Sequence, residues 1–178
     1  MPKHLPYEPG QIYFITSNVW KRQPIFVEKT NVLLLLADFI FYRQKLDFQI
    51  FAWVIMPDHF HWLIKPSAAY FAQFCADQRQ RKGKYSHDPS RYYLSHIMEK
   101  LKSHSSQVIN NQQMVRLWQQ GFHDRLIRDE KAFHAVINYI HNNPVQAGLV
   151  DDITAYRWSS YQAMFRGDAS LLKLDELD

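Results

Sequence analysis

The amino-terminal part of the chain carries a strand-like hydrophobic pattern and then a helical one. Residues 11–17 alternate β-branched and aromatic side chains up to a polar Ser-Asn boundary, which predicts a strand. Residues 28–45 have helical length and good helix-forming residues. Their apolar face falls at Val32, Leu36, Phe39 and Ile40. This part of the chain therefore predicts one strand followed by one helix.

The next segment predicts a β-hairpin. The run 48–56 is strongly β-forming, and 59–65 is a second run of the same kind. Pro57 and Asp58 between them supply a tight turn. Because strands joined by so short a turn pair antiparallel, we expect these two runs to be neighbours in one sheet.

Clean periodicity is lost after the hairpin. The stretch 66–93 mixes Pro66, Gly83 and Pro89 with basic residues, so we expect a long irregular excursion with room for one helical piece. Residues 94–109 then return to helical spacing.

The carboxyl-terminal half predicts one more strand and a helix. Residues 117–128 look like a fourth strand with an irregular start at Gly121. Asp129 is a suitable cap for the helix that follows, and Glu130 lies favourably in its first turn. The helix has an apolar stripe at Phe133, Val136, Ile137 and Ile140. Pro144 should end or bend it.

The element order is strand, helix, strand, strand, helix, strand, helix. This order predicts an α+β fold of the ferredoxin-like or RRM-like type, an antiparallel sheet of about four strands with packed helices and an added C-terminal helix. We expect a single domain over 1–178, with its core at about 11–162 and the basic excursion at 66–93. The segment from Tyr156 onward should pack against the core, and the acidic tail 168–178 should fray.

Composition limits the possible classes. A lone cysteine, Cys75, excludes an internal disulfide and a thiolate metal cluster, which fits a cytoplasmic location. Residues 1–10 lack the apolar core of a signal peptide. The longest apolar run, 32–42, contains Asp38 and is shorter than the roughly 20 residues that span a bilayer, so we expect no membrane partner.

The charge distribution is uneven. The whole chain carries +4 and the tail 168–178 carries −3, which leaves +7 on residues 1–167. Between 79 and 102, seven Lys and Arg residues outnumber two acidic ones, with three tyrosines among them. Cations and aromatic rings together are typical of single-stranded nucleic acid binding, although a solvated loop and helix face has the same composition.

Two histidines in the predicted hairpin are candidate metal ligands. His59 and His61 are two residues apart, so on a strand their side chains project to the same face. Two such imidazoles can share one divalent metal, and the adjacent turn leaves one side of the ion open. Ordinary surface histidines can show the same spacing.

A second pair lies on the predicted C-terminal helix. Tyr139 and Asn143 are four residues apart and therefore neighbours on the helix surface. A tyrosine hydroxyl can attack phosphorus, and an amide oxygen can coordinate a hard metal. The alternative is a tyrosine that covers the core edge and an asparagine that helps to stop the helix before Pro144.

Five sequence blocks carry a family resemblance. They are MPDHFHWLI at 56–64, LKS at 101–103, WQQGFHDRLIR at 118–128, YIHNNPVQAGLV at 139–150 and WSSY at 158–161. In this order and spacing they strongly resemble the REP-associated tyrosine transposases, which belong to the HUH single-tyrosine transposase superfamily. The similarity spans roughly residues 11–162.

The resemblance implies a set of roles. His59 and His61 would be the paired metal ligands, Tyr139 the nucleophile, and Asn143 the third ligand, a position where many relatives outside the REP-associated group carry glutamine. His123 and Asp124 would be structural or would support the site. The implied cofactor is a divalent metal, Mg²⁺ or Mn²⁺.

The same resemblance implies the reaction and the partner. The implied partner is single-stranded DNA with a hairpin, such as a repetitive extragenic palindrome, cleaved and rejoined through a 5′-phosphotyrosine by a monomer or homodimer. No nucleotide cofactor is needed, because one phosphodiester replaces another, and the chain has no Gly-rich phosphate loop. Two alternatives remain open: a hairpin DNA or RNA binding protein of the same fold without catalysis, and a metal-dependent hydrolase that uses water.

Overall fold

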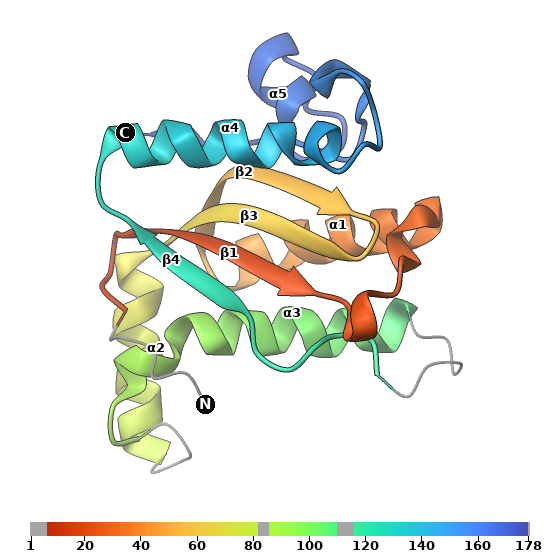
Figure 1. Ribbon diagram of the computed structural model, residues 1–178. Coiled ribbons are helices and arrows are strands. Elements are labelled where there is room, and N and C mark those ends of the chain that lie inside the picture. The colour runs from red at the N-terminus through yellow and green to blue at the C-terminus, as the bar shows by residue number, and fades with distance from the viewer. Residues whose placement is uncertain (1–6, 82–85, 110–115, 178) are drawn as a thin grey trace.

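The computed structural model describes residues 7–81, 86–109 and 116–177, whose arrangement is shown in Figure 1. The regular elements are β1 (Ile12–Asn18), α1 (Lys29–Lys45), β2 (Phe48–Met56), β3 (His59–Pro66), α2 (Ala68–Arg81), α3 (Tyr93–Ile109), β4 (His123–Ile127), α4 (Glu130–Gln146) and α5 (Tyr161–Arg166). No helix within these ranges has both the length and the apolar character that a membrane crossing requires.

The four strands form one antiparallel sheet in the order β2-β3-β1-β4. Helices α1 and α3 pack together on one face of this sheet, and α4 lies across the other face, over β2 and β3 (Figure 1). Strand order and helix placement are those of a ferredoxin-like sandwich. The fold class predicted from the element order is therefore confirmed.

The alternation of side chains on β3 separates two hydrophobic layers. Phe60 and Trp62 are fully buried in the layer with α1 and α3, whereas Leu63 packs in the layer with α4. His59 and His61 have the same parity as Leu63 and therefore share the α4 face. The hairpin that was predicted from the sequence thus places both histidines beneath the helix that carries Tyr139.

Helix α1 begins and ends close to the predicted bounds, but its buried face differs at two positions. Ile40 is 40% exposed, although its spacing assigns it to the apolar face. Asp38 is buried instead, and its Oδ1 lies 2.7 Å from Nδ1 of His104 on α3. The apolar side chains of α1 are spread around most of its circumference, so hydrophobic spacing alone does not identify the face that packs.

The excursion after β3 is more regular than predicted. Residues 68–81 form the 14-residue helix α2, and Pro89–Tyr92 form a short 3-10 turn before α3. Phe74 and Cys75 are the buried residues of α2, and Tyr70 and Phe71 are partly buried against the same core. Lys82 and Lys84 of the basic run lie outside the described residues.

Strand β4 is shorter than the predicted 117–128. It covers His123–Ile127, and Trp118 makes only an isolated bridge to Val19. Gly121 between them has a φ of +73°, a left-handed conformation that breaks the strand geometry and favours glycine. The irregular start expected at Gly121 is therefore a real interruption of the strand.

Helix α4 begins as predicted but does not end at Pro144. The Asp129 side chain caps it by accepting from the N–H of Ala132 at 2.7 Å. The helix continues through Pro144 to Gln146, and the N–H of Ala147 donates to the carbonyl of Asn143 at 3.0 Å. Proline lacks the N–H that would donate to the Ile140 carbonyl, and because only two helical residues follow it, the loss falls in the last turn of the helix.

The C-terminal segment packs along the free edge of β2. Ser159 forms an antiparallel bridge with Val54. Further on, Asp175 accepts from the N–H of Ile50 at 2.7 Å and forms an ion pair with Arg43. The acidic tail is therefore held against the sheet through this part of its length rather than frayed, because its carboxylate pairs with an edge N–H and a cation.

Candidate active site

The turn between β2 and β3 fixes the position of the histidine pair. The hairpin register leaves only Pro57 and Asp58 in the turn. Their carbonyl oxygens accept hydrogen bonds from the N–H groups of Phe26, at 2.9 Å, and Val19, at 2.8 Å. Because both turn carbonyls are bonded to neighbouring loops, the start of β3 is held on a rigid support.

The two histidines lie side by side on β3 and face α4. The ring centroids of His59 and His61 are 4.8 Å apart, and the ring planes are inclined by 80°. Only 9% of His59 and 4% of His61 is exposed. The geometry is that of two imidazoles that can share one ligand, as the spacing in the sequence predicts.

Each imidazole is held through its Nδ1 atom. His59 Nδ1 lies 2.6 Å from Asp58 Oδ1, and His61 Nδ1 lies 2.7 Å from Thr16 Oγ1 on β1. A carboxylate only accepts, so His59 Nδ1 donates and its Nε2 carries the lone pair. The Nε2 atom of His61 is buried and has no hydrogen-bond partner within residues 7–81, 86–109 and 116–177. An unpaired buried nitrogen is costly, by about 1–3 kcal/mol, and is therefore available for a ligand.

A strained turn places a cation on the same carboxylate. Arg22 Nε lies 2.8 Å from Asp58 Oδ2, and Arg22 Nη1 donates to Asn18 Oδ1 at 2.5 Å. Lys21 and Arg22 have φ angles of 54° and 56°, which cost of order 1–2 kcal/mol each for residues with a Cβ. The strained turn thus positions Arg22 against Asp58, which in turn contacts His59.

Both histidines are neutral near pH 7. Burial lowers the pKa of His59, an effect that outweighs the opposing influence of Asp58. Burial, followed by the nearby His59 and Arg22, lowers the pKa of His61 to about 3. A neutral imidazole keeps a lone pair on its free nitrogen, which is the form that binds metals.

Helix α4 brings Tyr139 and Asn143 to the histidines. The Tyr139 ring lies 5.3 Å from the His61 ring and 5.8 Å from that of Phe14, edge-on to the latter. Tyr139 is 41% exposed, whereas Asn143, one turn later, is 9% exposed and hydrogen-bonds to His59. The structure therefore brings all four residues singled out in the sequence to one place.

The donor set fits a divalent cation. Among the described residues there is no group of three or more His, Cys, Asp or Glu side chains that could hold a metal ion. Any further protein ligand beside His59 and His61 must therefore be of another type, and the Asn143 amide oxygen is adjacent. Among the described residues His61 Nε2 has no partner, whereas His59 hydrogen-bonds to Asn143. Two neutral imidazoles and an amide oxygen would hold a cation and leave positions open for a substrate.

His141 anchors α4 from its buried side. Its Nε2 lies 2.8 Å from Ser160 Oγ, which accepts from the N–H of Trp53 at 2.9 Å. The Ser160 proton is then free to donate to Nε2, so the ring serves as a neutral acceptor. Burial lowers the pKa of His141 to about 4. One hydroxyl thus connects α4, β2 and the C-terminal segment.

The buried His141 predicts a pH dependence of stability. Its pKa in the folded state lies below the ordinary value of 6.5, so the unfolded chain binds more protons between pH 6.5 and about 4. Stability is therefore lost as pH falls through this window, by at most about 1.4 kcal/mol per pH unit and roughly 3 kcal/mol in total from this residue. Urea unfolding is measured at several pH values with chelator present. The free energy of unfolding should fall less steeply with decreasing pH in His141→Gln than in the unaltered protein. Parallel curves for the two proteins would contradict the assignment.

His123 and Asp124 point to opposite faces of β4. Thr16 pairs with His123 on one side and His61 on the other, so His123 lies in the same cross-strand row as the metal-ligand candidate. Asp124 instead pairs with Ile15 and hydrogen-bonds to Tyr7 on the α1 side of the sheet. Neither is among the residues around the imidazole nitrogens, and a supporting role for them stays a prediction.

Three contributors were missed in the sequence. Asp58 was assigned only to the turn, although a carboxylate next to His59 is a recognisable signal for an orienting partner. Thr16 and Arg22 become neighbours of the histidines only through the β1–β3 register and the left-handed turn. No local sequence pattern reveals such contacts.

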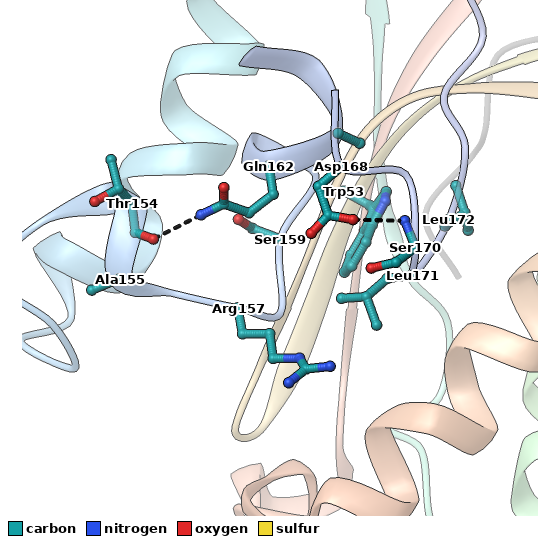
Figure 2. Close-up of a pocket in the computed structure, with 11 residues that line it drawn as sticks. Trp53, Thr154, Ala155, Arg157, Ser159, Gln162, Asp168, Ser170, Leu171 and Leu172 are labelled. Atoms are coloured by element: carbon teal, nitrogen blue, oxygen red, sulfur yellow. Dashed lines mark hydrogen bonds between the residues drawn. The ribbon is translucent and has the colours of Figure 1, made fainter. Parts of the chain in front are cut away.

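A separate cavity of about 330 Å³ lies between β2 and the C-terminal segment (Figure 2). Trp53, which belongs to the layer on the α1 side of the sheet, forms part of its wall. Two hydrogen bonds cross-link the segment itself: Gln162 donates to the Thr154 carbonyl at 2.8 Å, and the Ser170 N–H donates to Asp168 at 3.0 Å. These contacts order the segment itself, and the bridge from Ser159 to Val54 joins it to β2.

The chain combines a ferredoxin-like sheet, a pair of buried histidines on β3 and an exposed tyrosine on α4. A scan against models of known protein families finds no match. The chain is 23% identical to the REP-associated tyrosine transposase of Escherichia coli strain K12 over 157 residues, covering 87% of this chain and 79% of that protein. An uncharacterized protein of Haemophilus influenzae is 26% identical over 159 residues, covering 80% and 85%.

A solved structure supports the same fold. It is that of a REP-associated tyrosine transposase bound to a REP hairpin, with a TM-score of 0.70 and 21% identity, and it covers 100% of this chain and 92% of that one. The similarity to REP-associated tyrosine transposases that the sequence blocks predict is therefore confirmed in sequence, and the fold is confirmed in structure.

Proposed function

We propose that the protein is a transposase that cleaves and rejoins single-stranded DNA beside a hairpin, through a covalent 5′-phosphotyrosine at Tyr139. The observation that carries this proposal is the exposed Tyr139 ring 5.3 Å from His61, whose buried Nε2 has no partner in the described part of the chain. The related transposase from Escherichia coli and the solved complex with a REP hairpin support DNA hairpins as the partner.

In the proposed step, the Tyr139 oxygen attacks the scissile phosphorus. The P–O bond to the 3′ oxygen breaks, the tyrosine hydroxyl loses its proton, and the 3′ oxygen leaves as a hydroxyl. The 5′ phosphate remains on Tyr139 as a diester, so a second 3′ hydroxyl can reverse the attack and join strands without a nucleotide cofactor. The packing of the Tyr139 ring on His61 and Phe14 limits its orientations, which favours the reaction.

His59, His61 and Asn143 are the residues that would hold a divalent cation, Mg²⁺ or Mn²⁺. When bound, such a cation offsets the negative charge that develops on the phosphate in the transition state. Asp58 and Thr16 hold the two imidazoles through their Nδ1 atoms, so the other nitrogen of each ring would bind the cation, in place of the hydrogen bond that His59 makes with Asn143. The proposed place of action is the cytoplasm, where single-stranded DNA of the nucleoid is accessible.

The proposal is tested with labelled single-stranded oligonucleotides that carry short imperfect hairpins. The protein is incubated with them in Mn²⁺, Mg²⁺ or chelator, and the products are separated on a denaturing gel. We expect a metal-dependent covalent protein–DNA band. Tight binding without adduct or cleavage favours the non-catalytic binding protein instead, and cleavage without an adduct favours a hydrolase.

Asp58→Asn should weaken metal binding without unfolding the protein. Asparagine keeps the size of the side chain but removes the charge that pairs with Arg22 and orients His59. Outer partners of metal-ligating histidines typically contribute 10- to 100-fold in metal affinity, and we expect a loss in this range. Mn²⁺ titration monitored by electron paramagnetic resonance measures it without DNA. Asp152→Asn, at an exposed carboxylate that caps a distant turn, serves as the matched control.

A further inference from the structure

A hollow of about 400 Å³ opens beside Tyr139 on the α4 face of the sheet. Its walls include Phe14 on β1, Arg125 on β4, and Ala135 and Tyr139 on α4. The proposed nucleophile is therefore part of the wall. The two nucleotides on either side of a phosphate that reaches the Tyr139 oxygen therefore lie next to this hollow.

The register of the sheet forms the hollow. Phe14 pairs with Arg125, and Thr16 pairs with His123, so these four side chains project from the same face of β1 and β4. Helix α4 packs mainly on β2 and β3 and leaves this side of the sheet less covered. Where α4 passes it, the helix presents the exposed and small Ala135.

The chemistry of the walls suits a flat, aromatic ligand. The hollow exposes mainly apolar surface, and the Arg125 guanidinium lies 5.8 Å from the centre of the Phe14 ring. A planar ring that enters here meets an aromatic side chain and a cation, the pair of groups on which unstacked nucleobases are held. The exposed His123, together with Thr16 and Asp124, adds polar groups to the lining.

We propose that this hollow binds the unstacked base of one of the two nucleotides that flank the scissile phosphate. The inference rests on the proposed function, because it takes its substrate from the reaction at Tyr139. Binding of the base next to the nucleophile sets the register of the strand and so selects which phosphate is attacked. Phe14 and Arg125 are then substrate-binding residues, and Ala135 leaves the room that the base occupies.

The test uses variants that fill the hollow or alter its wall. Ala135→Leu adds volume at an exposed helix position with a good helix former, so folding is preserved. Arg125→Gln removes the cation and leaves the contacts of Tyr139 intact. His134→Leu places the same leucine at the neighbouring helix position, whose side chain is 63% exposed and lies outside the hollow, and serves as the control.

Equilibrium binding is measured by fluorescence anisotropy in the presence of chelator. The ligands are hairpin oligonucleotides whose single-stranded flank carries one abasic site. The position of this site moves by one nucleotide from one oligonucleotide to the next. For the unaltered protein we expect one abasic position to lower the affinity about tenfold, the typical value of one stacked base. Ala135→Leu should bind the intact strand about tenfold more weakly and should lose the effect of that abasic site. His134→Leu should match the unaltered protein.

Two results overturn the inference. Either Ala135→Leu binds the intact strand as well as the unaltered protein does, or the abasic site costs the same in both proteins. The adduct assay decides the proposed function separately. If no adduct forms but Ala135→Leu still removes the effect of one abasic position, the base-binding hollow stands and the catalytic proposal fails. If an adduct forms and the sensitive position does not flank the cleaved phosphate, the inference fails alone.

Discussion

Tyr139→Phe should lower the rates of covalent adduct formation and strand cleavage by at least about a thousandfold. Its affinity for the hairpin should stay within about twofold of that of the unaltered protein. Phenylalanine retains the ring that packs edge-on to Phe14 and against His61. It removes only the hydroxyl, which is the atom proposed to attack phosphorus. The adduct is measured on a denaturing gel and the affinity by anisotropy.

Tyr161→Phe is the matched control for this prediction. Tyr161 lies on α5, where its ring contacts His141 and Phe165 rather than the histidine pair. The variant should form the adduct at the normal rate. If Tyr139→Phe retains cleavage and loses only the adduct, the reaction uses water, and the hydrolase alternative replaces the phosphotyrosine route.

His61→Ala should remove both metal binding and metal-dependent cleavage, the latter by about a thousandfold or more, which corresponds to about 4 kcal/mol in the barrier. His61 supplies the buried Nε2 that has no partner among the residues that the structure describes. Its replacement also leaves a gap beside Phe14, whose ring stacks on the imidazole at 5.2 Å. Metal binding is measured by calorimetric titration with Mn²⁺ and folding by circular dichroism.

A second variant separates the loss of a ligand from the loss of packing. His61→Gln retains more volume and a polar atom, and should fold with nearly the stability of the parent while metal binding stays weak. His134→Ala, at an exposed position of α4, should leave metal binding unchanged. A His61→Ala protein that is folded and still binds Mn²⁺ with the original affinity would contradict the ligand assignment.

Much of the site could be predicted because its key residues follow local rules. The spacing of His59 and His61 on a β-forming run determines that they share a face, and a two-residue turn places them at a strand start. On α4, the helical stripe around Ile140 determines that Tyr139 lies at its edge. Period-two and period-3.6 patterns are properties of short segments, and therefore they are readable without the tertiary structure.

The remaining parts of the site depend on contacts between distant segments. Thr16 reaches His61 only because β1 is the strand that pairs with β3 in this register. The Ser160 hydroxyl meets His141 because the C-terminal segment returns along β2. The sequence predicted room for one helical piece in the excursion but not the bounds of α2, whose packed face depends on contacts with the distant Tyr93. Helix α4 continues two residues past Pro144.

The most direct test of the central claim is to locate the DNA on the protein. The covalent adduct formed in Mn²⁺ is digested with nuclease and trypsin, and the modified peptide is fragmented by mass spectrometry. Cleavage after Lys131 and Arg157 gives one peptide that holds both Tyr139 and Tyr156, and the latter already donates to the Ile55 carbonyl at 2.8 Å. The account predicts a nucleotide phosphodiester on Tyr139. A nucleotide on Tyr156 or on any other residue, or no modified peptide at all, would contradict it.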